Sequence, residues 1–148
     1  MGIADFLAPA DVIVDKRTTD KAQLLRELSQ RAAAAVGLDA ELVTSEILKR
    51  EALGSTGMGE GIAIPHVRIP SLDKPFGILA RLKKAIDFAA IDEKPVDLVF
   101  LLLLPGAAEG EQLNTLAGVA RKLRDSGTAA AIRRARDDAE AYAAIVQR

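Results

Sequence analysis

Short apolar runs and longer amphipathic stretches alternate along the 148-residue chain. Apolar runs bounded by proline or charged residues are typical of buried strands. Such runs predict strands at Val12–Val14, Ile62–Ile64, Phe76–Leu82 and Val96–Leu104. The last is the most hydrophobic segment of the chain and lies between Pro95 and Pro105, so it is expected to be a central strand buried on both faces.

Apolar residues that recur with the helical period predict the helices. Helices are expected at Asp20 to about Val36, Ala40–Glu51, Glu111–Arg124, Thr128–Arg134 and a last segment that contains Tyr142 and Ile145. Thr18 or Thr19 is the expected cap of the first helix and Asp39 that of the second. Gly37 is the expected stop between them. Asp137 to Glu140 resembles a capping box for the last helix.

The remaining segments have polar or loop-like patterns. Val67–Ser71 and Gly106–Gly110 are expected to be loops. A solvated face is expected at Arg133, Arg134 and Arg136. In the third helix, apolar residues recur with helical spacing and form a stripe: Leu113, Leu116, Ala117, Ala120 and Leu123.

Composition limits the classes of function. With 49% hydrophobic and 28% charged residues, the chain is expected to form one globular domain, residues 1–148. Twenty basic and 21 acidic residues give a net charge of −1, which offers no reason to bind nucleic acid or an anionic membrane. Partners should be proteins or small ligands. Because the chain has no cysteine, one histidine and no metal-binding motif, we expect no metal and no cofactor.

No segment predicts export or membrane insertion. The start MGIADFLAPAD lacks a basic region ahead of an apolar core, as a secretory signal would have. The longest unbroken apolar run, Leu98–Leu104, is far shorter than the ~20 residues that span a bilayer. A cytoplasmic location is the expectation.

The candidate chemistry lies in the segment from Gly54 to His66, GSTGMGEGIAIPH, which ends in the only histidine of the chain. Glycine permits positive φ and close backbone approach, so the N–H groups of Ser55 to Glu60 are expected to turn toward an oxyanion or phosphoryl group. Pro65 should end the preceding strand and leave His66 at the lip of the sheet. A tight turn followed by a structural histidine remains the alternative. The segment is not a nucleotide-binding loop, since no Lys-Ser or Lys-Thr pair follows the glycines.

Arg50 lies four residues before Gly54, in the last turn of the expected second helix. A cation there is favourable for the helix dipole alone. So close to the glycine segment, however, its guanidinium could bind a phosphoryl group in bidentate fashion, and we favour this interpretation.

The run from Arg50 to His66, REALGSTGMGEGIAIPH, resembles the active-site signature of the fructose/mannitol-class IIA phosphocarriers of the bacterial phosphotransferase system. The segment from Phe88 to Phe100, FAAIDEKPVDLVF, is similar to the same family. As a free-standing domain, the chain looks most like the nitrogen-regulatory branch. The resemblance implies an α/β fold, with a mixed parallel and antiparallel sheet flanked by helices.

The resemblance also implies roles for individual residues. His66 would be the phosphoacceptor, with Arg50 as its catalytic partner and Ser55, Thr56 and Gly57 binding the phosphate. Neutral imidazole would be the nucleophile, with its other ring nitrogen bound to an acceptor. Many relatives have a second histidine near the start of the third helix, where this chain has Gln112 and Asn114. We expect these two amides to face His66 as a possible second part of the site.

Two functions follow from the resemblance. The favoured one is a regulatory protein that an HPr-type carrier phosphorylates and whose phosphorylation state signals to protein targets. The alternative is a sugar-specific component that passes the phosphate to a IIB domain during carbohydrate uptake. Either would be a phosphotransferase component without independent turnover. A hydrolase that uses His66 as a general base is disfavoured, because no motif marks a serine, carboxylate or metal partner.

Overall fold

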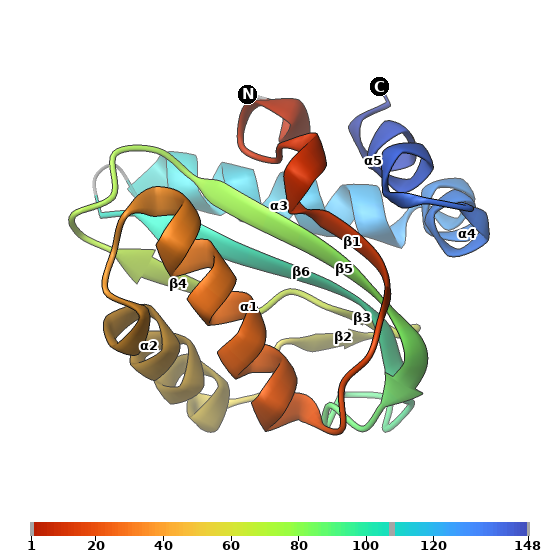
Figure 1. Ribbon diagram of the computed structural model, residues 1–148, viewed down its shortest axis with the longest axis horizontal. Helices are drawn as coiled ribbons and strands as arrows, with labels where there is room; N and C mark the ends of the chain where they lie inside the picture. The colour runs from red at the N-terminus through yellow and green to blue at the C-terminus, as the bar shows by residue number, and fades with distance from the viewer. Residues whose placement is uncertain (1, 107–108, 148) are drawn as a thin grey trace.

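The computed structural model describes residues 2–106 and 109–147, and all of their side chains except those of residues 109, 111 and 112. Its described part forms a six-stranded mixed sheet (Figure 1). The strands are β1 (Val12–Lys16), β2 (Gly57–Gly59), β3 (Ile62–Ala63), β4 (His66–Ile69), β5 (Phe76–Ile86) and β6 (Val96–Pro105). Their order is β1-β5-β6-β3-β2, and β4 pairs with β6 beyond the end of β3. The pairs β1/β5, β3/β6 and β4/β6 are parallel, whereas β5/β6 and β2/β3 are antiparallel, which confirms the expected mixed sheet.

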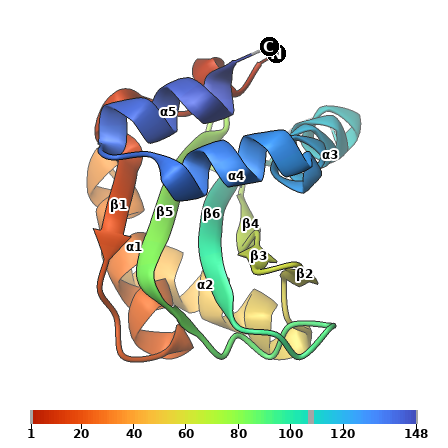
Figure 2. The ribbon, with the colours of Figure 1, turned by 90° about the vertical axis from the view of Figure 1, so that its right-hand side faces the viewer.

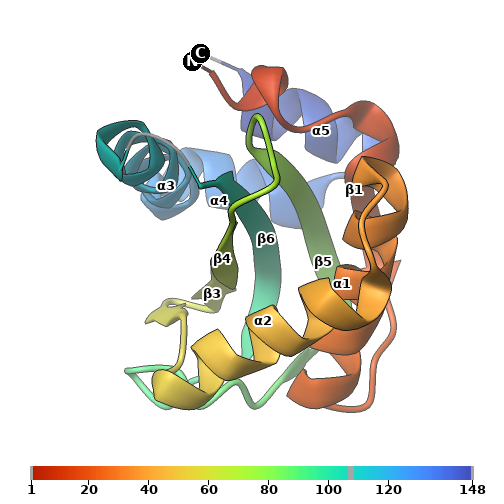
Figure 3. The same ribbon diagram turned by 90° about the vertical axis from the view of Figure 1, so that its left-hand side faces the viewer.

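Helices cover both faces of the sheet (Figures 2 and 3). One face carries α1 (Lys21–Val36) and α2 (Ala40–Leu53). The other carries α3 (Glu109–Arg124), α4 (Ser126–Arg134) and α5 (Asp138–Val146), together with the short 3₁₀ turns Ile3–Asp5 and Pro9–Asp11. No helix within residues 2–106 and 109–147 is long and apolar enough to cross a membrane.

Strand β6 is the centre of the core, as its hydrophobicity predicts. Alternate side chains of a strand point to opposite faces. Accordingly, Val99, Leu101 and Leu103 pack under α1 and α2. The alternating residues of β6 pack on the opposite face, under α3, α4 and α5: Leu98, Phe100, Leu102 and Leu104.

Helix ends follow the expected chemistry with two corrections. Asp39 caps α2, and Gly37 ends α1 in the left-handed conformation with φ of 71°. The cap of α1 is Asp20, whose side chain accepts from the N–H of Gln23, and not Thr18 or Thr19 as expected. Similarly, Asp125 caps α4, which begins at Ser126, before the expected Thr128.

Other corrections concern long-range packing. Val67–Ser71 is not all loop, because His66–Ile69 forms β4 in parallel register with Leu102–Pro105. Arg133 is not merely solvated. Its guanidinium donates to the Asp97 carboxylate at 2.8 Å and to the Glu60 carbonyl oxygen at 2.9 Å, so it ties α4 to the turn between β2 and β3.

Candidate functional site

His66 begins β4 directly after Pro65. Its register partner Leu102 belongs to the core under α3, α4 and α5, so the imidazole lies on that face of the sheet. Nδ1 lies 2.7 Å from the carbonyl oxygen of Ile64. A carbonyl oxygen can only accept, so Nδ1 must carry the ring proton. This tautomer leaves the lone pair on Nε2 available as a nucleophile.

The pKa of His66 lies below its ordinary value. Burial is the main cause, because it disfavours the charged imidazolium. The bond to the Ile64 carbonyl opposes this shift, the positive charge of Arg50 adds to it, and the negative charge of Glu51 opposes it. The net result is a neutral imidazole at physiological pH, as nucleophilic attack requires.

Two adjacent cavities open beside the ring. The first, of about 350 Å³, is lined by Arg50, His66, Val67, Arg68, Leu104, Leu113 and Leu116. The second, of about 250 Å³, is lined by Arg50, Ser55, Thr56, Gly57, Met58, Ile64, His66, Leu116 and Ala120. The structure therefore gathers all five residues that the signature suggested as acceptor, catalytic partner or phosphate ligands.

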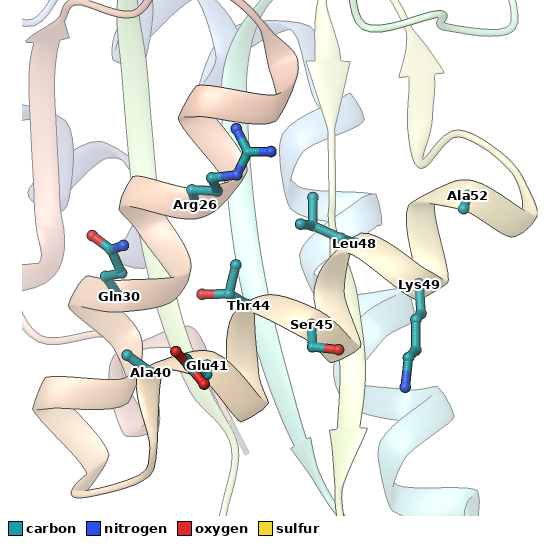
Figure 4. Close-up of a pocket in the computed structure, with 9 residues that line it drawn as sticks. All are labelled: Arg26, Gln30, Ala40, Glu41, Thr44, Ser45, Leu48, Lys49 and Ala52. Atoms are coloured by element: carbon teal, nitrogen blue, oxygen red, sulfur yellow. The ribbon is translucent and has the colours of Figure 1, made fainter.

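A larger cavity of about 570 Å³ lies between α1 and α2 (Figure 4). Its lining includes Arg26, Thr44 and Leu48, and neither His66 nor the glycine segment contributes to it. By size alone, this cavity would be the preferred candidate for a ligand site. The cavities beside His66 are the better candidate for a phosphoryl site, because the imidazole and Arg50 both line them.

The glycine segment is a hairpin, and not all of the N–H groups of Ser55 to Glu60 turn toward an anion site as expected. Gly57–Gly59 pairs with β3, and the turn residues Glu60 and Gly61 have φ of 58° and 81°. Three of its N–H groups have partners within the protein: Thr56 donates to Glu51 at 3.2 Å, Gly57 to the Ser55 hydroxyl at 3.0 Å, and Glu60 to Asp92 at 2.9 Å. The segment is thus held rigidly beside His66.

Arg50 lies at the end of α2 and beside both cavities. One Nη1 bond, 2.9 Å long, goes to the carbonyl oxygen of Gly54 at the end of α2. The same side chain lines both cavities beside His66. Because a guanidinium has several N–H donors, closing the helix end leaves donors for an anion in the cavity.

Ser55 and Thr56 make hydrogen bonds to the protein. The Ser55 hydroxyl donates to the Phe88 carbonyl oxygen at 2.8 Å. The Thr56 hydroxyl donates to the carboxylate of Glu51, which is buried. That carboxylate forms an ion pair of 2.8 Å with Lys21. The sequence pattern singled out neither charged residue: Glu51 stands beside Arg50 in the signature, but nothing in the sequence brings Lys21 there.

A model of the family "Phosphoenolpyruvate-dependent sugar phosphotransferase system, EIIA 2" matches residues 5–148. The chain belongs to this family. It is 43% identical over 145 residues to a nitrogen regulatory protein of Bradyrhizobium diazoefficiens, covering 98% of this chain and 95% of the relative. A nitrogen regulatory protein of Escherichia coli is 40% identical over 126 residues, which cover 84% of this chain and 77% of that one.

Solved structures agree with this assignment. The crystal structure of the nitrogen regulatory protein IIA-Ntr from Neisseria meningitidis superposes with a TM-score of 0.91 at 31% identity, covering 97% of this chain and 98% of the other. The mannitol IIA of Escherichia coli gives 0.75 at 18% identity, over 93% and 97% of the two chains, and supports the fold alone.

The start of α3 differs from the expected arrangement of this EIIA domain. Leu113, 67% exposed, and Leu116 line the first cavity beside His66. Asn114 instead lines a separate cavity of about 270 Å³, with Gly2 to Phe6 and the end of α5, so the structure does not bring it to His66. The side chain of Gln112 lies outside the described part of the structure.

The lowered pKa of His66 predicts a pH-dependent stability of the EIIA domain. The unfolded chain protonates its histidine near pH 6.5, whereas the folded protein does so only at lower pH. Between these two values the unfolded state binds more protons. The free energy of unfolding should therefore fall as pH decreases through 6.5 toward the folded pKa, and this contribution should be absent above that window.

Urea unfolding of the wild type and His66→Gln between pH 5 and 8 checks the expectation. Glutamine does not titrate, so the other ionisable groups cancel in the difference between the two proteins. The wild type should lose stability relative to the variant as pH falls. If the stability of the wild type relative to the variant stays constant, or rises toward acid pH, the imidazole is not a neutral, half-buried group with a lowered pKa.

Proposed function

We propose that this EIIA domain accepts a phosphoryl group on Nε2 of His66 from an HPr-type phosphocarrier, and that its phosphorylation state regulates protein targets. The observation that carries the proposal is the hydrogen bond from Nδ1 to the Ile64 carbonyl, which leaves Nε2 as the nucleophile in a cavity that Arg50 also lines. The regulatory output is supported by the identity of 40–43% with nitrogen regulatory proteins.

The transfer exchanges one N–P bond for another. The Nε2 lone pair attacks phosphorus as the bond to the donor imidazole breaks, and the bonding electrons return to the donor nitrogen. When both rings keep the proton on the nitrogen that bears no phosphorus, no proton has to move. Arg50 stabilises the negative charge on the equatorial phosphoryl oxygens, and the side chains of Leu113 and Leu116 form an apolar part of the cavity wall.

A second candidate is transfer of the phosphate to a IIB domain during sugar uptake. This candidate is supported by a fructose-specific EIIA component of Haloferax volcanii, which is 38% identical over 85 residues. The similarity covers 57% of this chain and 55% of the relative. The two candidates share the acceptor and differ only in the recipient.

The test uses an HPr-type carrier phosphorylated with radioactive phosphate. Wild-type protein should take up the label in an acid-labile form, as an N–P bond requires, and His66→Gln should take up none. Label on His66→Gln, or label that survives acid, would overturn the assignment of His66. Addition of a IIB domain to the labelled protein separates the two outputs, because only a sugar-specific component would lose its label to that domain.

A further inference from the structure

A buried carboxylate lies beside the cavity in which a phosphoryl group would be bound. The Glu51 side chain is 5% exposed, and its charge is close enough to His66 to affect the ring electrostatically. A buried charge is costly unless it is paired, and a second negative charge nearby increases that cost. The position of Glu51 next to an anion site therefore needs a compensating group.

Glu51 has a clear structural task despite this cost. Its two carboxylate oxygens accept from the N–H and the hydroxyl of Thr56, which is 7% exposed and lines the cavity beside His66. Bonds of this kind, with an ionised acceptor, are stronger than bonds between neutral groups. They fix the segment that connects α2 to β2.

Lys21 supplies the compensating charge from the first turn of α1. Its ammonium group lies 2.8 Å from the Glu51 carboxylate, donates to the Phe88 carbonyl oxygen at 3.2 Å and stands 4.4 Å above the Phe88 ring. The Ser55 hydroxyl donates to the same carbonyl oxygen at 2.8 Å. Lys21 thus connects α1, α2 and the segment after β5.

We propose that Lys21 and Glu51 are positioning residues for phosphoryl transfer: Glu51 fixes Thr56 beside His66, and Lys21 cancels the charge of Glu51 so that His66 can carry a phosphoryl group next to it. This inference rests on the proposed function of His66. Neither residue touches the reacting atoms, and both act through the segment that they hold and through the charge beside the ring.

The charges that face His66 make the inference measurable. Arg50 and Glu51 face the ring from α2 and Arg68 from β4, while α3 contributes Leu113 and Leu116 among its described side chains. Loss of Lys21 leaves the carboxylate uncompensated and should raise the pKa of His66. Loss of the carboxylate, with Lys21 kept, should lower it. A purely structural role predicts no such opposite shifts.

The test compares Lys21→Met, Glu51→Gln and the double variant, with the single histidine titrated by NMR and phosphotransfer from a phosphorylated HPr-type carrier measured in parallel. Lys21→Met should slow phosphotransfer by roughly tenfold or more, because breaking a buried pair strands its charge. The double variant should recover most of that loss, since the glutamine oxygen can still accept from the Thr56 hydroxyl.

Lys16→Met is the matched control. The side chain of Lys16 is 22% exposed, and that of Lys21 is 24% exposed. Lys16 forms an ion pair with Glu27 of α1 and lines neither cavity beside His66. This control should leave the His66 pKa and the transfer rate unchanged.

An unchanged rate and pKa in Lys21→Met, or a double variant as slow as that single variant, would overturn the inference. If Lys21→Met does not fold, Glu51→Gln decides alone, because an unshifted His66 pKa in that variant contradicts the charge coupling. Wild-type protein that takes no phosphate on His66 would refute the proposed function, whereas the titrations of the unphosphorylated variants would still report on the coupling.

Discussion

Replacement of Arg50 by lysine is expected to slow phosphoryl transfer to His66 by roughly 10- to 100-fold while the fold stays intact. Lysine keeps the positive charge, so it still suits the C-terminal end of α2. It also keeps the electrostatic effect that lowers the pKa of His66. What it loses is the planar fork that can close the helix end at Gly54 and bind an anion in the cavity at the same time.

The measurement is the single-turnover rate with a phosphorylated carrier, together with the free energy of unfolding. Arg134→Lys is the matched control, because Arg134 also lies in the last turn of a helix and lines neither cavity beside His66. Arg50→Lys should stay within about 1 kcal/mol of the wild type in stability. Equal losses of stability and transfer would show that Arg50 acts only as a helix cap.

Gly57→Ala is expected to destabilise the protein and impair transfer together. A Cβ at Gly57 would lie 2.7 Å from the Cβ and 2.8 Å from the Cα of Ala90, so the clash involves backbone that cannot simply rotate away. Overpacking of this kind costs about 1–3 kcal/mol. The methyl group should also push the glycine hairpin away from the segment after β5, which helps to fix Ser55 beside His66.

Gly118→Ala is the control for Gly57→Ala. Gly118 lies inside α3, and the nearest atom to an added Cβ there is Nη2 of Arg121 at 3.9 Å. Alanine should stabilise this helix by up to about 1 kcal/mol. Urea unfolding of the two variants should therefore give changes of opposite sign. A Gly57→Ala protein as stable as the wild type would mean that the hairpin and the segment after β5 are not tightly packed.

Local chemistry and strong hydrophobic patterns made much of the fold predictable. The apolar run of β6 indicated a strand buried on both faces, and Asp39 and Gly37 marked helix ends because capping depends on neighbouring residues alone. The signature from Arg50 to His66 brought the candidate site residues together, since they lie within 17 residues of one another.

Features that depend on distant parts of the chain were not predictable. Strand β4 contains an exposed arginine and precedes a proline, and only its pairing with β6 makes it a strand. Arg133 looked solvated because its partners Asp97 and Glu60 lie 36 and 73 residues away. Leu113 matched the helical stripe, yet it borders the open cavity beside His66 and remains exposed.

The site of phosphorylation on the imidazole ring tests the central claim most directly. The protein would be labelled with ¹⁵N in its single histidine, phosphorylated by an HPr-type carrier and examined by NMR at neutral pH. We predict that phosphorus is bonded to Nε2 and that Nδ1 keeps its proton, because Nδ1 donates to the Ile64 carbonyl. Phosphorus on Nδ1, or on the hydroxyl of Ser55 or Thr56, would contradict the assignment of Nε2 of His66 as the acceptor.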